Sequence, residues 1–322
     1  MIVDMHCDTL SELREKKRAG SRESLRQNTL CLDLERMKKH GYLLQNFAVF
    51  VDLKHTEDPY EDALDQIRLL HAELENSRDI CGQVYSYNDI QNHIKQGKLS
   101  VMLSLEEGGM CGGDSEKLRA LYEAGARMMT LCWNYENELG YPAVPEEGGS
   151  AKDSRVMGLK KKGIVFLEEM ESLGMIPDVS HLSDQGFWDV VKYTEKPFVA
   201  SHSNARSVWG HGRNLTDDML HAMGERGCVA GLNYYPLFLN GGDDSEKASA
   251  ALARHALHMV DQAGIESVGL GSDFDGFPAA SDVSDPAGTA NLIWALHRAG
   301  FSDRETELIC GGNVLRLYRE VL

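Results

Sequence analysis

The sequence begins with MIVDMHCD, and this stretch decides the fold. Its apolar residues favour a buried strand, and the strand ends on His6 and Asp8. Because side chains alternate along a strand, His6 and Asp8 point the same way, about 7 Å apart along the chain. In parallel barrels the active site lies at the carboxyl ends of the strands, where we expect these two groups to converge. A buried histidine that is hydrogen-bonded to its neighbour explains this pair, taken alone, equally well.

Short apolar stretches alternate with amphipathic ones along the rest of the chain, which is typical of a parallel sheet with helical connections. The predicted strands are Ile2–Asp8, Asn46–Asp52, Ser100–Leu105, Arg127–Cys132, Met175–Ser180, Phe198–Ser201, Cys228–Asn233 and Ser267–Gly271. A ninth apolar run, Gln83–Tyr87, is interpreted as a short extra strand or an insertion. Eight strand–helix units favour a closed (β/α)8 TIM barrel, and no GxGxxG motif follows the first strand to support a dinucleotide fold. We expect residues 1–322 to form a single catalytic barrel domain.

The composition narrows the class of partner. Lysine and arginine total 33 against 50 aspartates and glutamates, so the formal net charge is −17. A surface this acidic repels phosphate backbones and anionic membranes, so we expect neither nucleic acid nor a membrane as a partner. Seven cysteines without a CxxC pair favour reduced thiols. Because a cleavable leader would remove the opening motif, we expect the chain to act in the cytoplasm.

The stretch LSLEEGG, residues 103–109, supplies a further carboxylate. Alternation along the predicted strand continues an apolar row from Leu105 to Glu107 and places Glu106 on the other face. If the apolar row faces the barrel interior, Glu107 points inward, which is costly unless the carboxylate meets a cation or a metal. The alternative is that both glutamates are solvated loop acids.

Three later strand ends carry polar side chains. His181 ends the run DVSH and His202 ends the run ASH, on strands that follow each other in the chain. Asp273 follows the last predicted strand, where a carboxylate can orient or deprotonate an attacking water. Either histidine alone is more often a structural residue, and the Asp/Gly-rich stretch around Asp273 is also compatible with an ordinary turn. Two histidines at equivalent ends of neighbouring strands, together with the opening motif, favour a metal site.

These strand ends supply five candidate metal ligands: His6, Asp8, Glu107, His181 and His202. Imidazole and carboxylate ligands suit Zn²⁺ or a similar divalent transition metal, and not Ca²⁺. One tetrahedral zinc with an open position uses fewer ligands than this, so the set favours two Zn²⁺ ions per chain that share a carboxylate. Two ions about 3.5–4 Å apart can activate a water and polarise a carbonyl, which predicts a metal-dependent hydrolase.

At these residues the chain resembles the membrane (renal) dipeptidase family of zinc peptidases. The resemblance extends over nearly the whole chain through the motifs D-x-H-x-D-T at the start, E-G-G at 107–109, D-x-S-H at 178–181, S-H-S at 201–203, R-N at 213–214, G-x-D-F-D-G at 271–276 and G-G-N-x-x-R at 311–316. It implies that His6 and Asp8 bind one metal, that His181 and His202 bind the other, and that Glu107 bridges the two.

The resemblance also implies roles in substrate binding and catalysis. Arg213 holds the terminal carboxylate of the substrate, together with Tyr235, and a guanidinium fork suits a carboxylate. Asp273 takes the proton of the attacking water and passes it to the leaving amine. Mammalian members carry a histidine just past the fourth strand that helps to hold the substrate carbonyl, and here Trp133 stands there. An indole N–H donates one hydrogen bond but carries no charge, so we expect Trp133 to line the pocket and shape substrate preference.

Taken together, these features predict a cytoplasmic binuclear zinc dipeptidase that cleaves dipeptides with a free C-terminal carboxylate. The resemblance implies that a D-residue is accepted at the C-terminal position and that the protein forms a homodimer. One alternative is another two-metal amidohydrolase on the same barrel, such as a deacetylase or lactonase, which has no need of Arg213 as a carboxylate clamp. A catalytically inactive barrel that binds ligands is a further alternative, against which the full ligand set and Asp273 speak.

Overall fold

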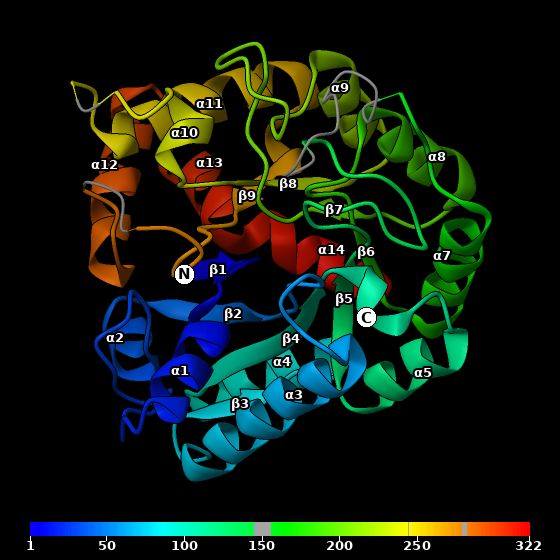
Figure 1. Cartoon of the computed structure of the whole chain (residues 1–322). Coiled ribbons are helices and arrows are strands. Elements are labelled where there is room, and N and C mark those ends of the chain that lie inside the picture. Colours follow the sequence, from blue (N-terminus) through cyan, green and yellow to red (C-terminus); the bar gives the residue numbers. More distant parts are fainter. Residues whose placement is uncertain (145–155, 244, 279–281) are drawn as a thin grey trace.

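The computed structural model describes residues 1–144, 156–243, 245–278 and 282–322. Parallel strands close into a barrel, visible at the centre of Figure 1. In order around the barrel they are β1 (Ile2–Asp4), β2 (Tyr42–Phe50), β4 (Leu99–Glu106), β5 (Ala126–Thr130), β6 (Ile176–Asp178), β7 (Val199–Ala200), β8 (Val229–Leu232) and β9 (Val268–Leu270). Each strand pairs with the next, and β9 pairs with β1. The predicted (β/α)8 barrel is confirmed.

Helices surround the strands, except for α14, which lies across the centre of the barrel in Figure 1. They are α1 (Thr9–Arg18), α2 (Leu34–Lys39), α3 (Pro59–Asn76), α4 (Tyr87–Gln96), α5 (Ser115–Glu123), α7 (Lys161–Leu173), α8 (Asp184–Tyr193), α9 (Asp217–Glu225), α10 (Pro236–Leu239), α11 (Ala248–Ala263), α12 (Thr289–Arg298), α13 (Asp303–Glu307) and α14 (Asn313–Val321). Local chemistry sets several of their ends. The side chains of Asp58 and Thr216 accept hydrogen bonds from the N–H groups three residues on and so begin α3 and α9, and Gly174, with φ of 76°, ends α7.

The strand side chains divide into two apolar clusters. One cluster fills the barrel and includes Met5, Met102, Met128 and residues of α14 such as Leu317. The other lies between the strands and the helices, and on β4 it takes Val101, Leu103 and Leu105. The apolar row of β4 therefore packs against the helices, and the alternate row, which ends on Glu106, faces the barrel interior.

The predicted strands are correct in position, but several begin or end a few residues away from the predicted boundary. β1 ends at Asp4, so His6 and Asp8 lie just past the strand, and β2 begins at Tyr42, four residues before the predicted start. The ninth apolar run corresponds to β3 (Cys81–Gln83), a short strand that pairs with the start of β4. Among the described residues, no helix is long and apolar enough to cross a membrane.

Candidate metal centre

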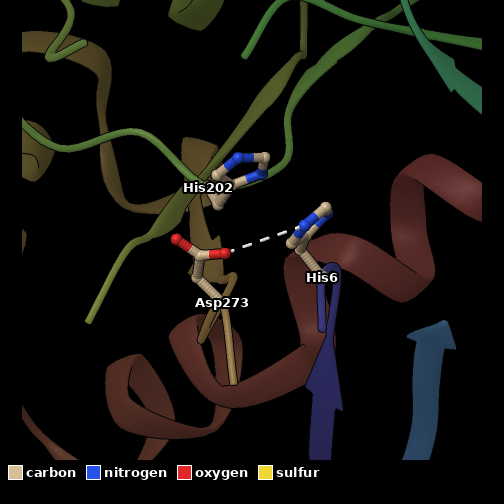
Figure 2. A group of neighbouring side chains, drawn as sticks. All are labelled: His6, His202 and Asp273. Carbon is tan, nitrogen blue, oxygen red and sulfur yellow. Dashed lines mark ion pairs between the residues drawn. The ribbon is translucent and has the colours of Figure 1, made fainter. Parts of the chain in front are cut away.

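Six polar side chains converge at the carboxyl end of the barrel: His6 and Asp8 after β1, Glu106 at the end of β4, His181 after β6, His202 after β7 and Asp273 after β9. Their ligand atoms form three groups, in each of which all atoms lie within 4.8 Å of one another. Figure 2 shows one group, in which His6, His202 and Asp273 meet from three separate segments of the chain. Five of these six residues were predicted from the sequence, and the structure brings all five together. Glu106 is the sixth member of the cluster.

Glu106 lies between the other ligand candidates. Its Oε2 is 3.3 Å from His6 Nε2, which is itself 3.5 Å from Asp8 Oδ2. Its Oε1 is 3.2 Å from His181 Nε2 and 3.7 Å from His202 Nε2. One carboxylate thus presents one oxygen to the His6–Asp8 pair and the other to the histidine pair, which is the geometry of a ligand shared by two metal ions.

Glu107 lies elsewhere, and the prediction that it points into the barrel is wrong. Its carboxylate accepts hydrogen bonds from the N–H groups of Gly109 at 2.6 Å and Trp133 at 2.9 Å, and from the side chain of Asn137. The alternation was assigned in the wrong phase, because the apolar residues of β4 face the helices. Glu107 also follows the end of the strand, with φ of 96°, so alternation no longer applies to it. Glu106 occupies the place that the sequence analysis assigned to Glu107.

Hydrogen bonds fix the tautomers of His181 and His202. His202 Nδ1 is 2.7 Å from Ser201 Oγ, whose own hydrogen is donated to Asp178 Oδ2 at 2.5 Å. Ser201 therefore accepts a hydrogen from His202 Nδ1. His181 Nδ1 is 2.9 Å from Asn134 Oδ1, which can only accept. Both rings are thus protonated at Nδ1 and keep the Nε2 lone pair for a metal.

Several buried atoms at this site lack a partner in a way that suits a divalent cation. His181 Nε2 and His202 Nε2 face each other at 2.9 Å, and two lone pairs this close repel unless a cation lies beside them. Among the described residues, His6 Nε2 and Asp8 Oδ1 make no hydrogen bond although both are buried. Burying such polar atoms is costly without a partner. Because imidazole nitrogens and carboxylate oxygens are the donors that zinc prefers, the residues present fit a metal of this kind.

The electrostatics of the metal-free site lead to the same conclusion. Burial lowers the pKa of His181 and of His202 well below the ordinary value, so both rings are in the neutral form that binds a metal. Burial also acts to lower the pKa of His6, but the carboxylates of Glu106 and Asp8 outweigh it and raise that pKa well above its usual range. A cation among these groups favours neutral histidines and charged carboxylates. It therefore stabilises the neutral form of all three histidines and offsets the repulsion between the buried carboxylates.

Asp273 lies beside this cluster with a strained backbone. Its Oδ1 is 3.8 Å from His6 Nε2, and its Oδ2 accepts a hydrogen bond from Asn233 Nδ2 at 3.0 Å. Burial, and then the neighbouring charges of Asp8 and Glu106, raise the pKa of Asp273 to about 8 despite the opposing effect of His6. A carboxylate that titrates near neutral pH is suited to exchange protons with a substrate.

Four residues other than glycine have positive φ among those described: Glu107, His181, Asp273 and Asp275. All four lie where the chain leaves a strand at the carboxyl end of the barrel. His181 and Asp273 belong to the metal-binding groups, and Glu107 directly follows Glu106. Left-handed backbone costs free energy in residues with a side chain and tends to occur at functional sites. The concentration of this strain at one end of the barrel supports the location of the site.

A cavity of about 220 Å³ opens over the cluster. Its walls include Glu12, Phe50, Trp133, Tyr235 and Phe238, and Asp8, Glu106, His181 and Asp273 lie within reach of its interior. The ring of Trp133 lies edge-on to Phe50 with centroids 4.7 Å apart, and Tyr235 packs against Phe238 at 4.8 Å. Trp133 and Tyr235 thus line the cavity, and their roles in substrate binding stay predictions.

Arg213 lies behind one wall of this cavity. It is buried, its Nη1 donates to Ser203 Oγ at 3.2 Å, and its Nη2 donates to the carbonyl oxygen of His202 at 3.4 Å. The guanidinium carbon is 5.5 Å from the ring centre of Phe238, which does line the cavity. Among the described residues Arg213 forms no ion pair, and its Nε has no hydrogen-bond partner. Burial lowers the pKa of Arg213 to about 10, so it keeps its charge at neutral pH.

Five residues that shape this site have no role predicted from the sequence: Glu106, Asn134, Asp178, Ser201 and Asn233. Asn233 ends a predicted strand and His181 directly follows one, so the position of Asn233 is a signal that the sequence offers. Asn134 directly follows Trp133 and has no pattern of its own. The contact between Asp178 and Ser201 joins neighbouring strands across 23 residues of sequence, so only the folded chain shows it.

Comparison with known proteins identifies the family. Residues 1–322 match the model of the membrane dipeptidase family, peptidase family M19. A dipeptidase of Aspergillus oryzae is 30% identical over 300 residues, which cover 90% of this chain and 70% of that protein.

Two solved structures have nearly the same fold. The metallopeptidase dipeptidase AC of family M19 superimposes with a TM-score of 0.89 at 27% identity, covering 99% of this chain and 98% of that one. A metallopeptidase of Rhodobacter sphaeroides, solved with a phosphinate mimic of the dipeptide L-Ala-D-Ala, superimposes with a TM-score of 0.90 at 25% identity, covering 100% of this chain and 99% of that one. A family match over the full length, a barrel shared with metallopeptidases and a buried cluster of metal-binding side chains agree, and the chain belongs to the membrane dipeptidase family of metal-dependent hydrolases.

Proposed function

We propose that this protein is a binuclear zinc dipeptidase that cleaves dipeptides with a free C-terminal carboxylate. The observation that carries the proposal is the position of Glu106, whose two oxygens face two separate pairs of ligand candidates. In this arrangement His6 and Asp8 would hold one zinc, His181 and His202 would hold the other, and both would share Glu106. When bound, the zinc ions supply Lewis-acid activation of a water and of the scissile carbonyl. We further propose that the 322 residues act as one catalytic domain.

Arg213 is the proposed holder of the substrate's carboxylate. A guanidinium that is buried without a carboxylate partner is costly, and a free carboxylate from a ligand would offset that cost. Phe238 lies between this charge and the cavity, and Tyr235 stands beside it. A small shift of Phe238 would open the guanidinium to the cavity. Arg213 therefore marks the end of the cavity where the C-terminal residue binds.

Asp273 is the proposed proton carrier. Its Oδ1 faces the cluster, and Asn233 holds the other oxygen in place. A carboxylate in this position accepts the proton of the attacking water and then donates it to the amine that leaves. Because Asn233 follows β8 and Asp273 follows β9, the two strand ends together hold the Asp273 carboxylate in place.

A D-residue at the C-terminal position is part of the proposal. Support comes from the related metallopeptidase of Rhodobacter sphaeroides, which binds a mimic of L-Ala-D-Ala over a barrel that superimposes on this one across the full chain. The expected behaviour is cleavage of L-Ala-D-Ala as well as of L-Ala-L-Ala.

The experiment is a panel of dipeptides assayed with zinc-loaded protein. Free dipeptides should be cleaved, whereas C-amidated dipeptides and N-acetyl amino acids should be poor substrates. Arg213→Met should lower kcat/KM on free dipeptides by about 10–150-fold, the range of one charge-assisted hydrogen bond. The same variant should barely change the low rate on amidated dipeptides. Equal wild-type rates on free and amidated dipeptides would contradict the carboxylate clamp and favour a different amidohydrolase activity.

A further inference from the structure

Glu12 carries a charge at the cavity wall that the proposed reaction does not use. It lies on α1, one helical turn after Asp8, and lines the cavity above the metal ligands. The backbone N–H of Glu12 donates to Asp8 O at 3.2 Å, but among the described residues its carboxylate has neither a hydrogen bond nor an ion pair. Glu12 is an exposed residue at the cavity wall, and the partial desolvation of its carboxylate, followed by the charges of Asp275, Asp8 and Glu15, raises its pKa against the opposing charge of Lys16.

The cations of α1 are all held elsewhere. Lys16, the residue one turn on that would ordinarily pair with Glu12, has its Nζ 3.2 Å from Glu23 and 2.8 Å from Thr29 Oγ1. The other basic residues of the helix pair with further carboxylates: Arg14 with Asp62, Lys17 with Glu73, and Arg18 with Glu15. Glu12 is therefore left facing the cavity without a counter-ion from its own helix.

Asp275, another carboxylate that lines the cavity, has hydrogen-bond partners for both of its oxygens. Asp275 Oδ2 accepts a hydrogen bond from Thr9 Oγ1 at 2.5 Å, and its Oδ1 accepts one from the N–H of Cys31 at 2.7 Å. Both oxygens thus hold the loop before α2 against the start of α1. Asp275 serves the structure of the rim, whereas the Glu12 carboxylate has no hydrogen-bond or ion-pair partner in the part of the chain that the structure describes.

The barrel order sets Glu12 apart from the carboxylate clamp. Arg213 follows β7. In the ring of eight strands β7 lies four strands from β2 in either direction, so the two strands are on opposite sides of the barrel. Glu12 follows β1, the neighbour of β2. A dipeptide with its C-terminal carboxylate toward Arg213 and its scissile carbonyl at the metal cluster extends its N-terminal residue toward α1. This orientation rests on the proposed function.

The separation between Glu12 and the metal ligands determines which part of the substrate can reach Glu12. The α-ammonium of the N-terminal residue is two bonds from the scissile carbonyl and stays near Asp8 and Asp273. Glu12 lies one helical turn after Asp8, about 5–6 Å along the axis of α1, and lines the cavity wall. A lysine or arginine side chain has the length and the charge to cross that interval. We propose that Glu12 selects dipeptides whose N-terminal residue carries a cationic side chain.

The test compares substrates that differ in charge and little in shape. Wild-type enzyme should cleave L-Arg-L-Ala with a kcat/KM about 2–5-fold above that for L-citrullyl-L-Ala, because an exposed ion pair gains less than a buried one. In Glu12→Gln this ratio should fall to near one. Glu12→Lys should reverse the preference, with L-Glu-L-Ala cleaved faster than L-Gln-L-Ala. The matched control is Glu15→Gln, an exposed glutamate of the same helix that does not line the cavity, and it should keep the wild-type ratio.

The outcomes separate this inference from the proposed function. A wild-type enzyme that cleaves both dipeptides at equal kcat/KM, with Glu12→Gln unchanged, overturns the role of Glu12 and leaves the dipeptidase intact. A zinc-loaded enzyme that cleaves no dipeptide overturns both. A ratio that falls equally in Glu15→Gln would show a general effect of the charge on α1 and also overturn the inference.

Discussion

The adjacent residues Glu106 and Glu107 give a sharp prediction, because the same substitution should have opposite consequences at the two positions. Glu106 presents its two oxygens to separate sets of metal-binding atoms, at 3.3 Å from His6 Nε2 and 3.2 Å from His181 Nε2. Glutamine offers one neutral oxygen in place of two charged ones. Loss of a residue that merely supports a ligand costs about 10–100-fold in metal affinity, so Glu106→Gln should cost at least about 10²-fold.

Glu107→Gln should instead affect folding stability. Burial raises the pKa of Glu107 to about 7, so its carboxyl group is already partly neutral at neutral pH and its charge is not essential. Its oxygens accept from three donors, and a glutamine NH₂ would face the N–H of Trp133 or another of these donors without an acceptor between them. One unsatisfied buried donor costs about 1–3 kcal/mol, which corresponds to a Tm lower by a few degrees in a chain of this size.

The assay is elemental analysis after dialysis against buffered free zinc, paired with thermal unfolding of the metal-free proteins. Glu106→Gln should retain less than half of the wild-type zinc with the metal-free Tm unchanged or raised. Glu107→Gln should retain wild-type zinc with a lowered metal-free Tm. The reverse pattern, zinc lost in Glu107→Gln and kept in Glu106→Gln, would refute the assignment of Glu106 as the shared ligand.

Three further predictions follow from the geometry. Asp273→Asn should lower kcat by about 10²–10⁴-fold with zinc content near wild type, and loss of zinc in this variant would make Asp273 a ligand instead. Ser201→Ala should weaken zinc binding by about 10–100-fold, since His202 Nδ1 loses its acceptor, and unchanged affinity in a zinc-chelator competition would exclude the relay from Asp178. Because the folded-state pKa of Asp273 is raised to about 8 from an ordinary 3.8, this residue stabilises the metal-free protein at low pH, and that contribution is lost as pH rises between about 4 and 8. The Tm of metal-free Asp273→Asn should therefore fall less steeply with pH than that of the wild type, and parallel curves would show that Asp273 does not titrate in this range.

The parts of the site that the sequence predicted are those in which the motif and its geometry are local. His6 and Asp8 lie two residues apart just past β1, and His181, His202 and Asp273 each follow a strand of the barrel, so the common end of parallel strands brings them together. The eight strands were recognisable because each is a short apolar run that precedes an amphipathic helix.

The choice between Glu106 and Glu107 depended on which face of β4 is inward. In the run VMLSLEE one alternate row of residues is apolar, and the other contains both apolar and polar residues. Because a barrel strand is buried on both faces, either row is compatible with the inward face. The more apolar row packs against the helices, a preference that a single strand's sequence does not reveal. The hydrogen bonds from His181 to Asn134 and from Ser201 to Asp178 likewise join segments whose proximity depends on the complete barrel.

The measurement that tests the central claim most directly is a crystal structure of the zinc-loaded protein with anomalous scattering recorded at the zinc absorption edge. The account predicts two anomalous peaks per chain, about 3.5–4 Å apart, with the carboxylate of Glu106 between them. His6 and Asp8 should contact one peak, and His181 and His202 the other. A single peak, or two peaks joined by Glu107, would contradict it.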